Sequence, residues 1–430
     1  MDIEIEDEAL RPRTHPLKIF DAAKSQQRFV YACAPMVRYS KLAFRQTVHH
    51  YGTDLCWTPM ILAKEFNRSP VARDSDLTIS SPLSPLSSSS SSKLPPRPPH
   101  ALSASASQKG GERGEGESVL YPGELPTIAQ FGANDPAELS RAASLAAPFV
   151  NGVDLNCGCP QSWACAESLG AALMERRELV RTLLVATRRR LADDGWAVDR
   201  DRDHGKGRSV SVKIRVHRDL RRTVDFISTV VGAVDWLTIH PRTRHTPSSA
   251  PIDVGALRLL TDMFGDRVPI LVSGDVFALS ELPYTSHLLQ QPPTFTTSIP
   301  LAEDADAEVK NTSSSPPLPA LPKLRGLMSA RALLSNPALF AGHAACPWEA
   351  VDYFMSAVAR APLPLKLAVH HLSEMCGPGF SLAQRAPGAA LLSRRERARL
   401  TDYGNWVDVV DYMDRVRGEK MRGEGVVRYG

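Results

Sequence analysis

The stretch Val153-Asp154-Leu155-Asn156-Cys157-Gly158-Cys159-Pro160-Gln161 decides how this chain folds. Its first three residues predict a strand. Gly158 and Pro160 cannot easily continue that strand and favour a turn. The pattern therefore presents Cys159 at the end of a strand, where a rigid scaffold can hold a reactive thiol. Two other interpretations of the cysteines stay open at this point. One is a packing role, and the other is a metal site, although no second closely spaced Cys/His pair follows.

Strand and helix patterns alternate on both sides of this stretch. The predicted strands are 29–34, 55–58, 127–131, 152–156, 209–214, 234–239, 269–272 and 324–328, and the predicted helices are 41–51, 60–66, 136–147, 167–191, 220–231, 254–264, 277–289 and 330–342. Eight alternating units predict an α/β fold, a closed (β/α)8 TIM barrel. A doubly wound open sheet is the alternative, and the chain has no Gly-rich fingerprint to support it.

Segments of different composition flank and interrupt these units. Residues 1–26 are polar, and we expect them to be disordered. Two stretches rich in Ser, Pro, Gly and charge, at about 80–120 and 290–323, are predicted to be disordered insertions, because they bury too little apolar area to offset their ordering entropy. Both precede strands, which predicts that they lie on the face opposite the strands' carboxyl ends. Residues 346–430 carry helical patterns at 351–359, 364–375 and 391–416 and predict a small C-terminal helical domain.

The overall composition is that of a globular protein. The 430 residues are 43% hydrophobic and 23% charged, and the net charge is +4. This charge permits a polyanionic partner without requiring one. The seven cysteines have no framework spacing, and we find neither a secretory signal nor an apolar run long enough to span a membrane. We therefore expect free thiols, a reducing compartment, a monomer, and neither a membrane nor a metal partner.

Polar residues follow the predicted strands at the end where barrel enzymes carry their chemistry. Gln130 offers a donor and an acceptor in one plane, which suits the edge of a flat heteroaromatic ring. Lys213 supplies positive charge for a reduced ring, and Gly274 lets backbone approach a ligand closely. Arg331 adds charge at a helix start that can hold phosphate. Because they fall at the same end of successive strands, these residues predict a site for a phosphorylated flat cofactor, FMN.

Four stretches make the chain resemble a known family. They are Ala34-Pro35-Met36-Val37-Arg38-Tyr39-Ser40, Asp54-Leu55-Cys56-Trp57-Thr58-Pro59-Met60, Asp154-Leu155-Asn156-Cys157-Gly158-Cys159-Pro160-Gln161 and Asn336-Pro337-Ala338-Leu339-Phe340-Ala341-Gly342. In them the chain resembles the tRNA-dihydrouridine synthases and is most similar to the eukaryotic dihydrouridine synthase 4 type. The resemblance covers about residues 28–345. It implies an FMN enzyme that reduces the C5=C6 bond of a uridine in the tRNA D-loop, at position 20a or 20b, with NADPH as the reductant.

The resemblance also implies roles for individual residues. Cys159 falls on the general acid, and Asn156 and Arg215 fall near the substrate uridine. The implied FMN contacts are Pro35, Met36, Gln130, Lys213, His240, Ser273, Gly274, Asp275, Ala330 and Arg331. The family usually has Asn and Gly where this chain has Ser273 and Ala330, so we expect somewhat weaker flavin binding. Residues 27–345 are then the FMN-binding catalytic domain, and residues 346–430 are a tRNA-binding region.

Two other functions fit parts of this pattern. A flavin-dependent reductase of a free pyrimidine or another small molecule would share the barrel and the flavin, but it would not need the helical C-terminal region. An RNA-binding module without flavin would not need Cys159, Lys213 and His240. We expect the tRNA enzyme, and we expect it in the cytoplasm and also in the nucleus.

Overall fold

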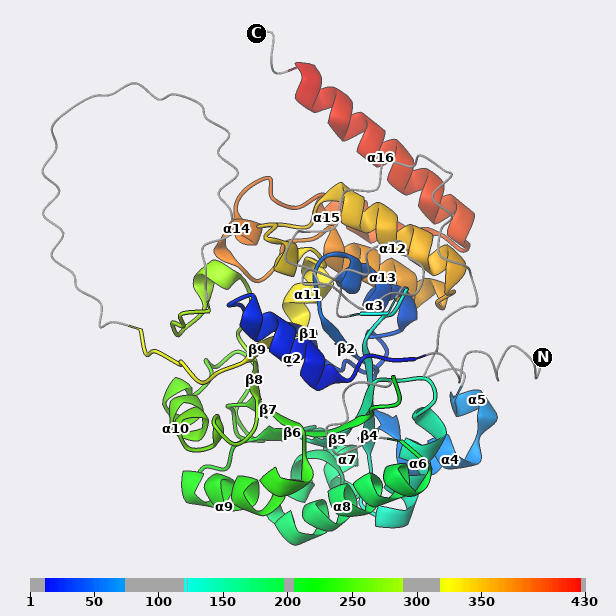
Figure 1. The fold of residues 1–430 in the computed structure, drawn as a ribbon. Coiled ribbons are helices and arrows are strands. Elements are labelled where there is room, and N and C mark those ends of the chain that lie inside the picture. Colours follow the sequence, from blue (N-terminus) through cyan, green and yellow to red (C-terminus); the bar gives the residue numbers. More distant parts are fainter. Residues whose placement is uncertain (1–11, 74–119, 122, 197–204, 289–317, 427–430) are drawn as a thin grey trace, which may run out of the picture.

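A closed ring of parallel strands forms the centre of the molecule (Figure 1). The computed structural model describes residues 12–73, 120–121, 123–196, 205–288 and 318–426. The barrel strands are β1 (Val30–Cys33), β2 (Leu55–Trp57), β4 (Thr127–Gly132), β5 (Gly152–Cys157), β6 (Ser209–Arg215), β7 (Trp236–His240), β8 (Ile270–Ser273) and β9 (Gly326–Ser329). They pair in the order β2-β1-β9-β8-β7-β6-β5-β4, and β2 also pairs with β4, which closes the ring. A short extra strand, β3 (Ile61–Leu62), pairs with β4. The predicted TIM barrel is confirmed.

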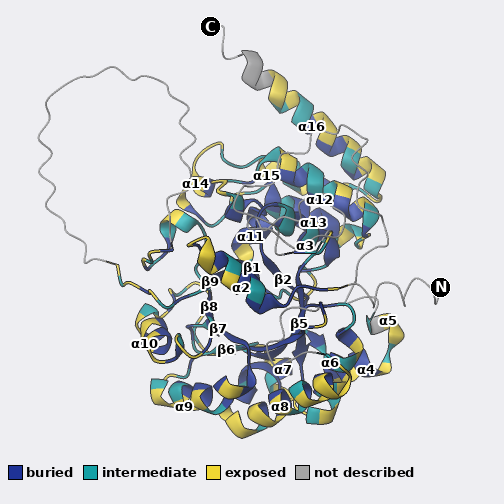
Figure 2. Ribbon diagram, viewed as in Figure 1, coloured by how far each residue is buried: buried dark blue, intermediate teal, exposed yellow. Residues whose placement is uncertain are grey.

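Helices cover the outside of this barrel. The elements that follow the strands are α3 (Leu42–His50), α4 (Ala63–Arg68), α5 (Pro70–Ala72), α6 (Pro136–Ala146), α7 (Ser162–Ala166), η2 (Gly170–Glu175), α8 (Arg177–Asp193), α9 (Leu220–Val230), η3 (Val231–Ala233), α10 (Val254–Phe264), η4 (Leu279–Glu281), α11 (Arg331–Ser335) and η5 (Leu339–Ala341). Several begin at an aspartate cap: the Asp135 carboxylate accepts hydrogen bonds from the amides of Ala137 and Glu138 at 2.8 and 3.0 Å. Figure 2 shows buried strands surrounded by helices that are exposed on their outer side.

Helix α2 (Pro16–Ser25) lies across the ring of strands (Figure 1). Leu17 and Phe20 are buried, and the Phe20 ring centroid lies 5.6 Å from that of Trp236 at the start of β7. The helix therefore closes the amino ends of the strands with an apolar face. The prediction of disorder for 1–26 is wrong for this segment, because its few apolar residues have helical spacing and a core to pack on. Residues 1–11 lie outside the described residues.

Three predicted helices are shorter than expected. The described part of 277–289 contains only η4, because Pro283 cannot continue a helix. The predicted helix 167–191 is divided into η2 and α8, and Gly170 at its start has a φ of +59°. The last predicted helix of the barrel ends before Pro337, which separates α11 from η5.

The C-terminal region is helical, as expected. Its elements are α12 (Trp348–Arg360), α13 (Leu365–Met375), α14 (Leu382–Arg385), α15 (Arg394–Arg399), η6 (Leu400–Asp402) and α16 (Trp406–Val426), so the predicted helix 391–416 is divided as well. Figure 1 shows α12 and α13 beside α3 and α16 extending away from the barrel. His371 of α13 is fully buried and stacks on Phe44 of α3, with ring centroids 5.0 Å apart. The buried apolar residues of this region are continuous with those of the barrel.

Most of the two predicted insertions lies outside the described residues. The end of the second insertion, 318–323, is described. Thr285 and Ala320 form a β-bridge there, and Leu321 is fully buried. The prediction of disorder is therefore wrong for these last residues, because Leu321 finds a place in the core.

Candidate active site

Cys159 lies on the turn that follows β5, and its side chain is partly exposed. The Asn156 Oδ1 atom accepts hydrogen bonds from the amides of Gly158 and Cys159 at 3.0 and 2.8 Å. On the other side, the Cys159 carbonyl accepts from the amide of Ala171 at 2.9 Å. These bonds fix the turn at both ends and present the thiol at the carboxyl end of the barrel. Cys157 is fully buried, and burial raises the pKa of its thiol, which fits a packing role.

Gly170 supports the same turn and is a residue that the sequence analysis missed. Its φ is +59°, and a Cβ atom there would lie 2.6 Å from the Cys159 carbonyl oxygen. Gly170→Ala should therefore displace the Cys159 turn and lower the free energy of unfolding by about 1–3 kcal/mol. Urea titration of the two proteins measures this loss. Gly232→Ala is the matched control, because its Cβ would meet nothing within 4 Å. It should change the same quantity by less than about 0.5 kcal/mol, and equal effects of the two substitutions would contradict the prediction.

Lys213 on β6 and His240 on β7 lie at the same end of the barrel as Cys159. In the sheet, Lys213 is opposite Asn156 of β5, and Arg215 is opposite His240. Desolvation and Arg215 lower the pKa of Lys213 to about 8, while Cys159 acts in the opposite direction. Desolvation and then Lys213 lower the pKa of His240 to about 2, so His240 is neutral. The strand registers thus place the Cys159 turn, the amine and the imidazole at the carboxyl ends of three successive strands.

The groups around Lys213 fit an anionic, flat cofactor. Its ammonium has no hydrogen-bond or ion-pair partner within the part of the chain that the structure describes. A desolvated cation without a partner is unfavourable, so the site favours a ligand that carries negative charge. At Gly274, with a φ of +109°, a Cβ would lie 3.0 Å from the His240 Nε2 atom and from a guanidinium nitrogen of Arg242. The absence of a side chain at Gly274 lets the His240 and Arg242 side chains pack against its backbone. The ammonium of Lys213 at this end of the barrel fits an anionic cofactor such as FMN.

Arg242 is a second residue that the sequence analysis missed. Its side chain is 3% exposed, donates to the Ala250 carbonyl at 2.8 Å, pairs with the Asp275 carboxylate, and lies 3.0 Å from the His240 Nε2 atom. The other Asp275 oxygen accepts from the Ile252 amide at 2.8 Å. Both carboxylate oxygens are therefore engaged inside the protein. This leaves the backbone of Asp275, rather than its carboxylate, to contact a cofactor.

Further predicted FMN contacts lie at the adjoining ends of β8, β9 and β1. Ser273 is the buried last residue of β8, Ala330 precedes α11, and Pro35 and Met36 follow β1. The Arg331 guanidinium is exposed and lies over two aromatic rings, 5.8 Å from the centroid of Phe277 and 5.1 Å from that of Phe380. One of its nitrogens donates to the Ser248 carbonyl at 3.2 Å, which leaves further donors for an anion.

The side chains of Gln130 and Arg215 both form hydrogen bonds with residues on neighbouring strands and loops of the barrel. The Gln130 Nε2 atom donates to Asp154 at 2.8 Å, and its Oε1 atom accepts from Asn156 at 2.8 Å. Gln130 is fully buried, so in this structure its amide is engaged within the protein. Arg215 donates to the carbonyls of Gly158 and Thr243, both at 2.8 Å. Arg215 therefore links the turn after β5 to the loop after β7.

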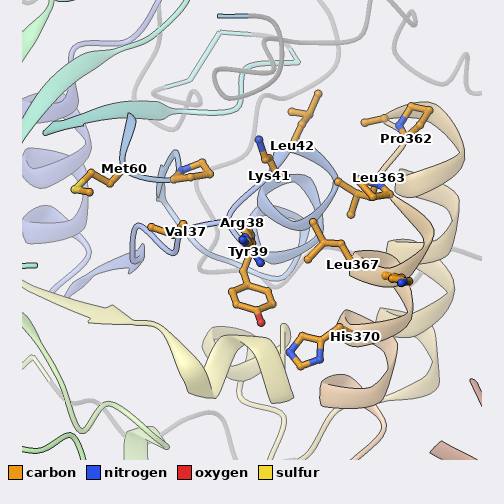
Figure 3. Close-up of a pocket in the computed structure, with 14 residues that line it drawn as sticks. Val37, Arg38, Tyr39, Lys41, Leu42, Met60, Pro362, Leu363, Leu367 and His370 are labelled. Carbon is orange, nitrogen blue, oxygen red and sulfur yellow. The ribbon is translucent and has the colours of Figure 1, made fainter. Parts of the chain in front are cut away.

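A groove of about 830 Å³ lies beside the loops after β1 and β2 (Figure 3). Those two loops line one side of it. The segment that joins α12 to α13, together with α13 itself, lines the other. Its basic residues are Arg38, Lys41, Lys366 and His370, and none of its described lining residues is an aspartate or a glutamate. The Tyr39 and His370 rings face one another, with centroids 5.2 Å apart. None of the predicted FMN contacts lines this groove, so it is a feature separate from the Lys213 site.

The described residues contain no group of three or more His, Cys, Asp or Glu side chains that could hold a metal ion. None of their helices combines the length and the apolar character needed to cross a membrane.

Comparison with known proteins finds one family and several curated relatives. The family described as "Dihydrouridine synthase (Dus)" matches residues 32–87 and 117–287. A tRNA-dihydrouridine(20a/20b) synthase (NAD(P)+) of Schizosaccharomyces pombe is 31% identical over 96% of this chain and 96% of its own length. A human protein named tRNA-dihydrouridine(20a/20b) synthase (NAD(P)+)-like is 32% identical over 78% of this chain and 78% of its own length. The Saccharomyces cerevisiae enzyme of the same name is 29% identical over 96% of this chain and 86% of its own length.

Proposed function

This chain belongs to the dihydrouridine synthase family, and from that premise we propose that it reduces the C5=C6 bond of a D-loop uridine in tRNA, at position 20a or 20b. The names of the relatives support the substrate, the two positions and an NAD(P)H reductant. The observation that carries the proposal is the position of Cys159, Lys213 and His240 at the carboxyl ends of the adjacent strands β5, β6 and β7. FMN is the cofactor that this donor set fits, and NADPH is the proposed reductant.

Bound FMN supplies hydride transfer between NADPH and C6 of the uracil ring. The chain contributes charge, orientation and a proton. The positive charge of Lys213 would stabilise the negative charge of the reduced cofactor ring. His240, kept neutral and fixed by Arg242, lines the same wall. Cys159 holds a proton on Sγ for C5, and Asn156 fixes the backbone of the Cys159 turn. The uridine must leave its stacked position to reach these groups.

The groove of Figure 3 is the proposed path of the tRNA backbone beside this site. Arg38 and Lys41 come from the barrel, and Lys366 and His370 from α13. Their charges suit a phosphate chain, and the groove is formed jointly by the barrel and the C-terminal helices. This arrangement supports the expectation that residues 346–430 help to bind tRNA. A reductase of free pyrimidines would have no use for such a groove.

One experiment tests the proposed function. The full-length protein is purified, its absorbance near 450 nm is recorded, and it is mixed with NADPH and tRNA from cells that lack the gene. Mass spectrometry should find dihydrouridine at position 20a or 20b. Free uridine under the same conditions is the control and should stay unreduced. Reduction of free uridine alone would favour the small-molecule reductase, and absence of flavin together with tRNA binding would favour the RNA-binding module.

The activity should depend on pH through Lys213. Because the pKa of Lys213 is lowered to about 8, its positive charge is present below that pH and is lost as the pH rises through it. Turnover on tRNA should then fall by about tenfold for each pH unit above the pKa of Lys213, which a bound anionic cofactor would raise above 8. Lys213→Arg, which keeps its charge, should flatten the alkaline limb of the pH–rate profile. An unchanged alkaline limb in this variant would assign the titration to another group.

Location and assembly are part of the proposal. The seven cysteines are all free thiols, which supports a reducing compartment, and we place the protein in the cytoplasm and the nucleus. A monomer is expected, and light scattering on the purified protein measures it.

A further inference from the structure

A chain of side-chain hydrogen bonds runs through the barrel and ends at the catalytic turn. It begins at Asp154 on β5, whose side chain is fully enclosed. The Ser211 hydroxyl donates to Asp154 Oδ1 at 2.6 Å, and Gln130 Nε2 donates to Asp154 Oδ2 at 2.8 Å. Asn156 Nδ2 then donates to Gln130 Oε1 at 2.8 Å. The Asn156 Oδ1 atom finally accepts from the amides of 158 and 159. The chain therefore joins three strands, β6, β5 and β4, to the turn that carries Cys159.

The direction of every bond in this chain is determined by its two ends. An ionised carboxylate only accepts hydrogen bonds, and a backbone N–H only donates. With Asp154 at one end, the Gln130 amide must turn its NH2 group towards the carboxylate and its oxygen towards Asn156. The Asn156 amide must then turn its NH2 group to Gln130 and its oxygen to the turn. Without an acceptor at Asp154, the Gln130 NH2 group would lose its partner, and the Gln130 and Asn156 amides would be held in these orientations from the turn alone.

We propose that Asp154 is a positioning residue for the reaction: acting through Gln130 and Asn156, it fixes the orientation of the turn that holds the Cys159 thiol. The catalytic part of this inference rests on the proposed function, whereas the structural part does not. Asp154 touches no reacting atom. Its carboxylate determines which way two intervening amides point, and these amides hold the backbone at Cys159.

A different role for Asp154 would be to balance the charge of Lys213, which also interacts with it. The two roles predict opposite results for Asp154→Asn. An asparagine at this position can still present an oxygen to Gln130, while its NH2 group donates to the Ser211 hydroxyl, which can donate in turn to the Val153 carbonyl 3.5 Å away. Positioning is then kept although the charge is lost. A charge-balancing role predicts that asparagine and alanine at this position are equally harmful.

Hydrogen exchange of the backbone amides in 157–161, followed by mass spectrometry on the full-length protein, tests the structural part. In Asp154→Ala, exchange at the amides of 158 and 159 should become about tenfold faster, as in the reference variant Asn156→Ala. Asp154→Asn and Ser211→Ala should each stay within about twofold of wild type. Unchanged exchange in Asp154→Ala, or equal acceleration in Asp154→Asn, would overturn the proposal.

A volume-matched variant keeps the test decisive if Asp154→Ala does not fold. In the double variant Asp154→Asn with Ser211→Ala, the NH2 group of the introduced asparagine has no hydroxyl to bind, so residue 154 can turn either its oxygen or its NH2 group to Gln130 and no longer specifies the direction of the hydrogen-bond chain. Amide exchange at the turn should then be several-fold faster than in wild type, although neither single substitution changes it. Such a non-additive effect is expected when two residues belong to one hydrogen-bond network. If the amides of 158 and 159 exchange in the double variant at nearly the wild-type rate, as the sum of the two single effects predicts, the proposal is also overturned.

Turnover on tRNA provides the catalytic measurement. Asp154→Ala should lower kcat by about tenfold with little change in the KM for tRNA, and Asp154→Asn should restore most of the loss. A rise in KM alone would show that Asp154 serves substrate binding and not the turn. If wild-type protein forms no dihydrouridine, the proposed function fails, while the exchange measurement still decides the positioning role.

Discussion

Replacing Cys159 by alanine is expected to leave the flavin bound and to lower turnover on tRNA by a factor of about 10²–10⁴. The physical reason is local. The hydrogen bonds to Asn156 and Ala171 hold the backbone of residue 159 without help from the thiol, so alanine keeps the turn and removes only the proton donor. Dihydrouridine formation under single-turnover conditions measures the loss, and absorbance near 450 nm measures the bound flavin.

Cys165→Ser is the matched control for this prediction. Cys165 is also a partly exposed thiol, and its Sγ atom lies 3.9 Å from the Cys159 carbonyl oxygen. It has no place in the proposed chemistry, so its replacement should leave turnover within about twofold of wild type. Near-normal turnover in Cys159→Ala, or an equal loss in Cys165→Ser, would reject Cys159 as the proton donor.

Asp54→Ala should lower the free energy of unfolding by about 3–5 kcal/mol, because it leaves a buried arginine without its partner. The Arg28 guanidinium donates two hydrogen bonds to Asp54, at 2.7 and 2.9 Å, and the side chains are only 8% and 1% exposed. The same carboxylate accepts from the amide of Tyr31 on β1 at 2.8 Å. The pair therefore ties the segment before β1 to the start of β2. Urea titration followed by circular dichroism and fluorescence measures the loss.

An exposed ion pair provides the control for Asp54. Arg189 and Asp193 are 83% and 66% exposed and approach to 3.9 Å on α8. Asp193→Ala should change the free energy of unfolding by less than about 1 kcal/mol, since water already solvates both charges. The double variant Arg28→Met with Asp54→Leu should recover much of the loss, because it removes the unpaired charge as well. Equal losses in the single and double variants would mean that the lost hydrogen bond from the Tyr31 amide, and not the unpaired charge, accounts for the effect.

The barrel could be predicted because strand and helix periodicity is a local property of the chain. Each run of four to six residues with strand character marks a strand whichever strand it later pairs with, and Asn156 with Gly158 and Pro160 marks where one strand ends. The same reasoning placed Lys213, His240 and Cys159 at successive strand ends, because parallel strands of a barrel put their carboxyl ends on one face. The prediction failed for the polar segment before β1. Helix α2 forms there because Phe20 packs on the amino end of the barrel, a partner that lies far away in the sequence.

The sequence by itself therefore determined the closed barrel, the end of it that carries chemistry, and the residues that stand there. Only the tertiary structure decided what holds those residues in place. Three contacts hold them, and no local sequence pattern predicts any of the three. Gly170 packs against Cys159, Arg242 contacts His240, and Asp154 accepts a hydrogen bond from Gln130. The reason is physical: periodicity depends on neighbours along the chain, whereas burial, charge interaction and hydrogen-bond direction depend on partners that folding brings together.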